Sequence, residues 1–233
     1  MIKIENTVVP HGEQWKSLIL GARNAMNSWD KSDSGWVDFE DWDCGHGIPD
    51  GMGNAYVIGN NDLDLMTRLS KVGTDHRKFM RMIVVYADIT APRYWWTEYD
   101  TYKIGTVANS CSTMHKIHEK EFTLDDFSHE HLDIRTIEVL HNTIKVLNDY
   151  RNLYVNYNSD DFEINGCPSK KDFWWQMIQL LPQSYNQKRT VMLNYEVLKN
   201  MYHSRKNHKL DEWKAFCDWI EKLPYAKELI CNE

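Results

Sequence analysis

The sequence lacks an apolar run long enough to cross a membrane, because no stretch approaches the roughly 18 uninterrupted apolar residues that a spanning helix requires. It also lacks a secretion signal at its start, since MIKIENTVVPHGEQW contains no basic region followed by an apolar run. The sequence therefore predicts a soluble, cytoplasmic protein with no membrane partner.

Cysteine and positive charge are both scarce. The chain has 5 Cys at scattered positions, and this odd number favours free thiols in a reducing compartment over a disulfide framework. Its 27 Lys and Arg stand against 34 Asp and Glu, which gives a net charge of -7. This balance argues against an extended nucleic acid as partner. It is compatible with a small anion held in a locally basic pocket.

The sequence does contain enough apolar material for a substantial core. Its 233 residues are 42% hydrophobic and 26% charged, which is typical of a globular protein, and we expect a single domain over residues 1–233. The 10 Trp and 12 Tyr are unusual. Aromatic rings stack on flat ligands such as bases and flavins, although core packing is their commoner use.

The spacing of apolar residues predicts a mainly helical α+β fold with few strands. Residues 82–89 (MIVVYADI) are rich in β-branched side chains and predict a buried strand. A helix is expected to begin at Pro92 and to carry Trp95, Trp96, Tyr99 and Tyr102. One-sided apolar patterns predict the other helices at residues 15–27, 63–72, 131–154, 172–181, 190–203 and 210–223.

Three segments predict irregular structure. Residues 32–61 are rich in Gly, Asp and Trp without a sustained period, and predict a long ordered loop that either serves function or makes solvated turns. Residues 105–113 (GTVANSCST) predict a tight loop. Residues 156–171 predict an exposed, turn-rich surface insertion.

The segment 91–117 (APRYWWTEYDTYKIGTVANSCSTMHKI) resembles the signature region of the flavin-dependent thymidylate synthases. That family has an Ala-Pro, a helix, an Arg-His-Arg triplet, seven further residues and a Ser. Here Ala91-Pro92 opens the helix, Thr101-Tyr102-Lys103 takes the place of the triplet, and Cys111 stands at the Ser position.

A second stretch resembles the family's C-terminal region, which has Leu-Pro, an Asn twelve residues later, another Asn six beyond it and an Arg five after that. The chain has Leu181-Pro182, Asn194, Asn200 and Arg205 at these intervals. Near the N-terminus, Gly21-Ala22-Arg23 resembles the family's Ala-Ala-Arg. Residues 65–73 resemble the helix before its first flavin-contacting loop. The resemblance covers about half of the chain, in four ordered blocks.

The resemblance implies a mainly helical domain around a small β-sheet and a homotetramer with shared active sites. It also implies that FAD accepts a hydride from NADPH and then serves a one-carbon transfer from methylenetetrahydrofolate to C5 of dUMP. The protein's part is to bind, orient and supply charge. The residues expected to contact the flavin are His76, Arg81, Thr101, Tyr102, Lys103, Asn194 and Asn200.

Arg205 is the first candidate for catalysis, because it stands where the family's Arg touches the pyrimidine and the flavin. Its alternative is a solvated helix Arg, just as His76 and the two Asn can be plain surface residues. The residues expected to contact the nucleotide are Glu98, Ser110, Ser112, Thr113, Lys188 and Arg189. The small residues among them can instead cap a helix.

Cys111 is the second catalytic candidate. Its thiol has Lys103 and His115 near it in sequence and can act as a nucleophile on C6 of a pyrimidine. The alternative is a small buried thiol that fills space. We predict no metal site, because the cluster His115, His118, His129 and His131 has no Cys pair or H-E-x-x-H pattern beside it.

The chain departs from the family at charged positions. Only Lys103 remains basic in the triplet, while Thr113 and Ile178 stand where the family has Arg, and Glu98 where it has Gln. Each lost charge-assisted contact costs roughly 1.5–3 kcal/mol, so ordinary dUMP methylation is not expected. The candidates for replacement charge are Arg77, Lys78, Arg81, Lys188 and Arg189.

These observations lead to one principal hypothesis and two alternatives. The first is an FAD-dependent enzyme that transfers or modifies a one-carbon group at C5 of a pyrimidine deoxynucleotide, with hydroxymethylation or action on a cytosine or a nucleoside in place of dUMP methylation. The second is a non-catalytic nucleotide-binding or regulatory protein that keeps the fold without flavin. The third is an interaction protein with an exposed aromatic surface.

Overall fold

The computed structural model describes residues 2–38, 47–158 and 168–232. The chain divides into two compact units built from alternating segments. Unit 1 consists of Met1–Lys3, Thr90–Tyr99 and Ser110–Arg189, and unit 2 of Ile4–Ile89, Asp100–Asn109 and Thr190–Glu233. The predicted single domain stays a prediction.

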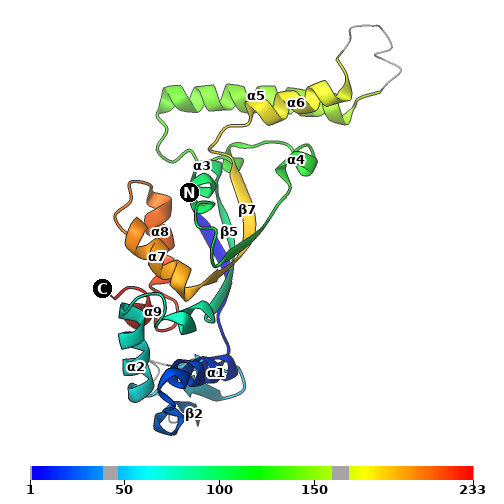
Figure 1. Ribbon diagram of the computed structural model, residues 1–233. Coiled ribbons are helices and arrows are strands. Elements are labelled where there is room, and N and C mark those ends of the chain that lie inside the picture. The colour runs from blue at the N-terminus through cyan, green and yellow to red at the C-terminus, as the bar shows by residue number, and fades with distance from the viewer. Residues whose placement is uncertain (1, 39–46, 159–167, 233) are drawn as a thin grey trace. The chain divides into compact units, whose positions relative to one another are not determined.

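The described residues form helices and two small sheets, so the predicted α+β class is confirmed (Figure 1). The larger sheet has four strands in the order β1-β5-β7-β6. Their bounds are β1 Lys3–Val8, β5 Val84–Pro92, β6 Thr106–Ser110 and β7 Asn186–Asn194. Residues 82–89 were predicted as a strand, and β5 covers most of them.

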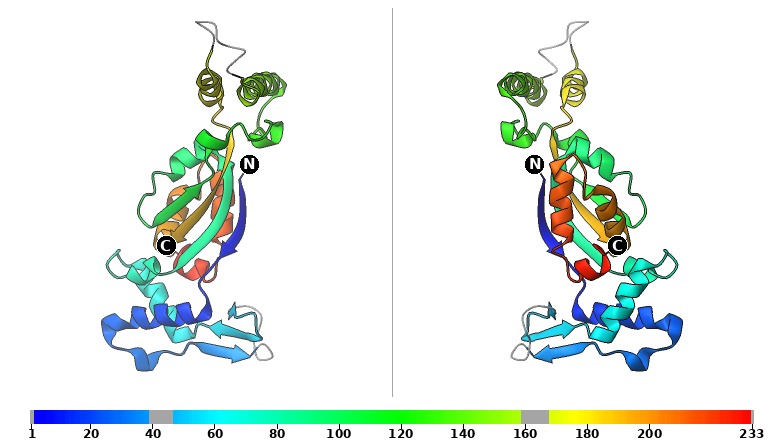
Figure 2. Two further views of the ribbon diagram at one scale, coloured as in Figure 1. Left: turned by 90° about the vertical axis from the view of Figure 1, so that its right-hand side faces the viewer. Right: turned by 90° about the vertical axis from the view of Figure 1, so that its left-hand side faces the viewer.

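Unit 1 is dominated by two long helices, α5 (Ile134–Val155) and α6 (Lys170–Leu180), which lie side by side (Figures 1 and 2). The carboxylate of Asp133 accepts from two backbone N–H groups at the start of α5, which explains why the helix begins there. Ser169 and Asp172 form a capping box at the start of α6. The shorter elements are α3 Arg93–Tyr99, α4 Thr113–Lys116 and the 3₁₀ turn η5 Leu124–Asp126.

The apolar faces of α5 and α6 meet in a core cluster, whose buried members are Ile117, Phe122, Phe127, Leu140, Ile144, Leu147, Met177 and Leu181. Ile178 packs against this cluster. An Arg at position 178 would bring a charge to an apolar surface, so the departure from the family at this position has a structural reason.

Unit 2 contains the helices α1 Gly12–Arg23, α2 Asn60–Lys71, α7 Tyr195–Arg205, α8 Asp211–Ile220 and α9 Ala226–Leu229. Its short 3₁₀ turns are η1 Asn24–Met26, η2 Trp29–Lys31 and η4 Lys78–Arg81. The second sheet, in the order β2-β4-β3, lies beside α1 (Figure 2). Its strands are β2 Gly35–Asp38, β3 Ile48–Pro49 and β4 Asn54–Val57, all antiparallel, with Gly35 opposite Val57.

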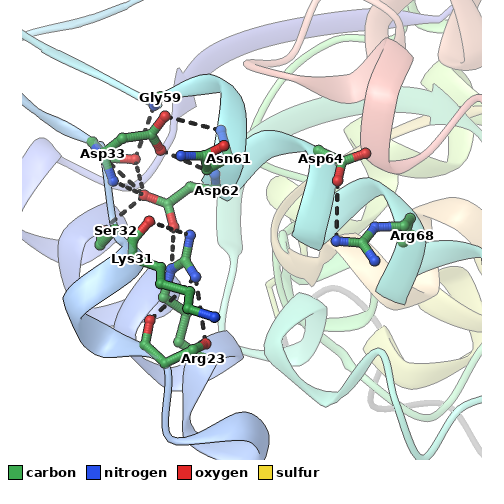
Figure 3. A network of polar contacts seen from close by, with 11 residues as sticks. Arg23, Lys31, Ser32, Asp33, Gly59, Asn61, Asp62, Asp64 and Arg68 are labelled. Atoms are coloured by element: carbon green, nitrogen blue, oxygen red, sulfur yellow. Dashed lines mark hydrogen bonds and ion pairs between the residues drawn. The ribbon is translucent and has the colours of Figure 1, made fainter.

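A buried ion pair joins the end of α1 to the first turn of α2. The Arg23 Nε lies 2.5 Å from the Asp62 Oδ1, and both side chains are buried (Figure 3). The other carboxylate oxygen accepts from the hydroxyls of Ser32 and Ser34 and from the N–H groups of Asp33 and Ser34. Burial raises the pKa of Asp62, but these hydrogen bonds and Arg23 outweigh it and lower the pKa below its usual value.

Three sequence predictions need correction. Residues 32–61 hold the strands of the second sheet, because Trp36 and Tyr56 pair across β2 and β4 where we expected a loop. Residues 105–113 include β6, an edge strand with mostly exposed and polar side chains. The sequence therefore lacks the apolar alternation by which a strand is recognised. Residues 190–203 begin as β7, where Val191 and Leu193 alternate with more exposed residues, and become helical only at Tyr195.

The remaining element predictions hold in type, with bounds shifted by a few residues. Trp95 and Trp96 are buried on α3, which supports the core reading of these rings, whereas Tyr102 lies beyond the end of that helix. The predicted insertion at 156–171 falls largely on residues 159–167, which lie outside the described residues. No helix among the described residues is long and apolar enough to cross a membrane.

Candidate functional site

A cavity of about 620 Å³ in unit 1 brings together residues that are far apart in sequence. It is lined by Cys111, Ser112 and Thr113 after strand β6 and by Lys188 on β7, all of them predicted site residues. A backbone hydrogen bond of 3.0 Å from Cys111 N to Lys188 O fixes the two segments beside each other. The volume falls in the range of small-molecule sites, about 300–1,000 Å³.

Gln187 organises one wall of this cavity. Its Nε2 donates to the Cys111 carbonyl at 3.1 Å and to the Thr113 Oγ1 at 3.0 Å, and its Oε1 accepts from the Arg189 Nε at 3.1 Å. The Gln187 carbonyl in turn accepts from the Trp96 indole N–H at 2.9 Å. One side chain therefore sets the position of the loop that carries Cys111.

Arg189 is held by an aromatic ring as well as by Gln187. Its guanidinium carbon lies 4.2 Å from the centroid of the buried Trp96 ring, a cation–π contact. We predicted Arg189 as a nucleotide contact, and it is not among the residues that line the cavity. Its contacts with Gln187 and Trp96 instead support one wall of the cavity.

The charged residues that line the cavity balance one another, with three lysines and three acids among them. Lys116 pairs with Glu119, and Lys120 pairs with Asp126, so two of the lysines in the lining already form ion pairs with carboxylates of the same lining. Burial, reinforced by Asp126, raises the pKa of Tyr185 on the same wall, which keeps that hydroxyl protonated and able to donate. Such a lining suits a polar ligand of low charge better than a bare phosphate.

Cys111 is exposed, so the alternative of a small buried thiol that fills space is wrong. Ser112 caps α4 through a hydrogen bond of 3.2 Å from the His115 N–H to its Oγ, as the capping alternative had it. Ser110 ends the exposed edge strand β6, and Glu98 is half-buried on α3. Neither of these last two lines the cavity.

Arg205 lies in unit 2, at the end of α7, in an aromatic bracket. Its Nε donates to the Tyr102 hydroxyl at 2.9 Å, and its guanidinium carbon lies 4.7 Å from the Trp213 ring and 5.5 Å from the Tyr102 ring. Trp213 is fully buried and meets Tyr102 edge to face. Two rings and a hydroxyl therefore restrict the position of the partly exposed Arg205, and its catalytic role stays a prediction.

Asn194 has a local structural partner. Its Oδ1 accepts from the Val197 N–H at 2.9 Å and thereby caps α7. Gly105 approaches it so closely that an added Cβ would lie 2.6 Å from the Asn194 Nδ2, and Gly105 has a φ of 81°. This asparagine holds the loop that follows Lys103 against the start of α7.

Arg77 and Arg81, which were expected to provide positive charge for an anionic ligand, form ion pairs within the protein. Both arginines bind the Glu196 carboxylate, Arg77 through its Nε at 3.3 Å and Arg81 through its Nε and a second nitrogen. The hydrogen bond to Glu196 is the main cause that raises the pKa of Arg81. Glu196 is buried, and its single negative charge offsets one of the two positive charges that would otherwise attract a diphosphate.

The other predicted flavin contacts are on the surface of unit 2. His76, Thr101, Lys103 and Asn200 are exposed. Ile104, beside Lys103, is 90% exposed. Sequence reasoning missed Gln187, Glu196 and Trp213. No local pattern identifies Glu196 as the partner of Arg77 and Arg81, because it lies more than a hundred residues further along the chain.

No group of three or more His, Cys, Asp and Glu that could hold a metal occurs within residues 2–38, 47–158 and 168–232. His129 uses its Nδ1 on the Phe127 carbonyl at 2.8 Å, and His118 packs on the Tyr154 ring. His118 and His129 thus have different partners.

No protein-family model matches the chain, and no curated protein matches it. Solved structures do match. The flavin-dependent thymidylate synthase ThyX from Helicobacter pylori, complexed with FAD and dUMP, is 15% identical with a TM-score of 0.57, over 98% of this chain and 97% of that one. A second structure of ThyX from that organism with FAD and dUMP gives 15% identity and a TM-score of 0.59, over 98% and 96%.

The chain has a ThyX-like fold. The resemblance inferred from motifs is thereby confirmed at the level of the fold, over nearly the full length of both chains. At this identity the likeness shows the fold alone, because one fold can carry many functions.

Proposed function

We propose that the chain is an FAD-dependent enzyme that transfers or modifies a one-carbon group at C5 of a pyrimidine deoxynucleotide or deoxynucleoside. The observation that carries the proposal is the unit 1 cavity, in which Cys111, Ser112, Thr113 and Lys188 converge from segments far apart in sequence. The likeness to ThyX complexed with FAD and dUMP supports the ligand class.

The near-neutral lining of the cavity favours a substrate other than dUMP. A phosphate monoester needs charge-assisted contacts, usually from Arg, and Lys116 and Lys120 already pair with carboxylates. Hydroxyl and amide groups recognise the edge of a base. We therefore place a deoxynucleoside first among the substrates to be tested, with dCMP and dUMP after it.

The residues of unit 2 fit a flavin in part. Exposed Lys103 and Asn200 can hold it, and Arg205 presents a guanidinium that Tyr102 and Trp213 keep in place. Arg81 and Asn194 do not fit, because Glu196 and the cap of α7 already use them. When bound, FAD supplies the redox chemistry, and the protein's groups orient the reactants and balance charge.

In this proposal Cys111 is the candidate nucleophile and Gln187 its positioning residue. An exposed thiol at the cavity can lose its proton and add to C6 of a pyrimidine, which opens the C5=C6 double bond and makes C5 nucleophilic toward a one-carbon group. Loss of the C5 proton and elimination of the thiolate then restore the double bond. The amide nitrogen of Gln187 donates to both the Cys111 carbonyl and the Thr113 hydroxyl, and so holds the two residues in place. Oligomeric state is part of the proposal: a homotetramer with shared sites, by likeness to the family.

The test is an absorbance spectrum of the purified protein before and after addition of FAD and desalting. We expect flavin bands that survive desalting in the wild type. Arg205→Ala should weaken them, whereas Arg68→Ala, at an exposed pair on α2, should not. Retained flavin would lead to turnover assays with NADPH, methylenetetrahydrofolate and deoxyuridine, dCMP or dUMP. A protein that stays colourless at excess FAD would contradict the flavin proposal.

A second candidate function is a nucleotide-binding or regulatory protein without flavin. The engagement of Arg77 and Arg81 by Glu196 favours it, since this pairing halves the positive charge that these residues could offer to a diphosphate. Glu196→Gln discriminates the two proposals. Release of the arginines should allow FAD binding in a protein that otherwise has none, and should change little if the wild type already retains flavin.

A further inference from the structure

Unit 1 contains a second cavity, of about 440 Å³, that the proposed function does not use. Its lining residues come from α4, the end of α5 and the start of α6, and they are Met114, His115, Tyr154, Lys170, Lys171 and Trp174. We call it the Trp174 cavity. None of these residues belongs to the cavity that contains Cys111.

Two aromatic side chains of the Trp174 cavity have fixed positions. Tyr154 and Trp174 are half-buried and pack against the core cluster of α5 and α6. The Trp174 indole N–H donates to the Met114 carbonyl at 2.8 Å, and the Tyr154 ring meets His118 at 4.6 Å. Rings that are held in this way offer stacking surfaces with little loss of side-chain freedom on binding.

The charged residues of the Trp174 cavity are all basic. The Lys170 ammonium lies 4.9 Å from the Tyr154 ring centroid, Lys171 is exposed, and His115 is the remaining ionisable residue in the lining. Within residues 47–158 and 168–232, the lining contains no Asp or Glu, in contrast to the Cys111 cavity with its paired carboxylates. This cavity therefore attracts an anion.

The position of the two lysines strengthens this inference. Lys170 and Lys171 are the first two residues of α6, where the helix macrodipole disfavours positive charge. Asp172, the acid of that first turn, is used in the capping box with Ser169. A bound anion would interact favourably with both the lysines and the helix start.

We propose that the Trp174 cavity binds a nucleoside phosphate, with its phosphate at Lys170 and Lys171 and its base against Tyr154 and Trp174. The pairing of flat rings with cations matches a ligand that carries a base and an anionic group together. This site lies outside the Cys111 cavity, and its occupancy does not depend on flavin.

Isothermal titration calorimetry tests the proposal with AMP and UMP, and with adenosine and inorganic phosphate as partial ligands. Lys170→Ala/Lys171→Ala should lose one nucleotide per chain or bind it roughly tenfold or more weakly, as expected when a charge-assisted contact is lost. Lys171→Arg should retain binding. Both partial ligands should bind more weakly than the nucleotides.

Matched controls locate the site. Lys145→Ala removes an exposed lysine from the middle of α5 and should leave nucleotide binding unchanged. Lys188→Ala alters the Cys111 cavity and should leave the Trp174 cavity occupied. Equal affinity and stoichiometry in the wild type and in Lys170→Ala/Lys171→Ala would overturn the proposal. Adenosine binding as tightly as AMP would overturn the role of the lysines. The FAD spectrum of the double variant reports separately on the proposed function.

Discussion

Removal of the Asp62 carboxylate should destabilise the protein far more than removal of its neighbour Asp64 on the same helix. Asp62→Ala leaves the buried Arg23 guanidinium without a counter-ion and deprives four hydrogen-bond donors from residues 32–34 of their acceptor. Breaking one partner of a buried pair costs about 3–5 kcal/mol. Asp64 pairs with Arg68 at 3.0 Å on the exposed side of α2, where such a pair contributes about 0.3–0.5 kcal/mol (Figure 3).

The assays are thermal unfolding and equilibrium unfolding in urea, each followed by circular dichroism and by Trp fluorescence. Asp62→Ala should lower the melting temperature by about 6–20 °C, since 1 kcal/mol corresponds to about 2–4 °C for a chain of this size. Asp64→Ala should shift it by at most about 2 °C. Equal losses in the two variants would refute the assignment of Asp62 to a buried network. The joint variant Arg23→Met/Asp62→Leu should recover part of the loss.

The same pair predicts a pH dependence. The pKa of Asp62 is lowered in the folded state, so the unfolded state binds more protons in the acid range. The contribution of Asp62 is therefore complete above about pH 4, the usual Asp pKa, and is lost as the pH falls through the folded-state value. The difference between the wild type and Asp62→Ala should narrow at acid pH.

Three further predictions concern other parts of the chain. Burial, with Arg77 and Lys71 nearby, lowers the pKa of Lys199 to about 8. Between that pH and the usual Lys pKa, the stability of the wild type relative to Lys199→Met should therefore rise with pH, by at most about 1.4 kcal/mol per pH unit. A difference in the free energy of urea unfolding that stays constant with pH would contradict this. Gly105→Ala should lower the free energy of unfolding by roughly 1–3 kcal/mol, because Gly105 has a φ of 81° and lies close to Asn194. Gly35→Ala, with no atom within 4 Å of its added Cβ, should lower it by less than about 1 kcal/mol in the same assay. Cys111→Ser should remove one rapidly reacting thiol in titration with a disulfide reagent. Cys217→Ser should not, because burial raises the pKa of Cys217 to about 12. An unchanged fast phase in Cys111→Ser would contradict the exposure of that thiol.

Sequence patterns predicted the elements whose signals are local. Helix α5 was predictable because Leu140, Ile144 and Leu147 repeat at helical spacing and all are buried. Strand β7 was missed because its alternation of buried and exposed residues continues directly into the apolar pattern of helix α7. The boundary between the two elements is evident only from the pairing of β7 with its neighbours in the sheet. Edge strand β6 was missed because its side chains are mostly exposed and apolar residues do not alternate with polar ones along it.

The residues that line the candidate site were predicted in part, through the resemblance to a known family, which supplied Cys111, Ser112, Thr113 and the distant Lys188. Cys111, Ser112 and Thr113 follow one another, and the motif register pointed to them. The partners that decide what these and other residues can do are distant: Gln187 meets Cys111 across a separation of 76 residues, and Glu196 meets Arg81 across 115. Contacts of this kind depend on the whole topology, and a local pattern does not contain them.

The interleaving of the two units bears on the order in which this chain can fold as it is synthesised. Unit 2 receives its last segment, from Thr190 onward, only after all of unit 1 has been translated. Its interactions with that segment, such as those of Glu196 with Arg77 and Arg81, close loops of more than a hundred residues. Contacts of such long range form slowly. Until then, the unsatisfied N-terminal segment of unit 2 is the part of the nascent chain most in need of protection from aggregation.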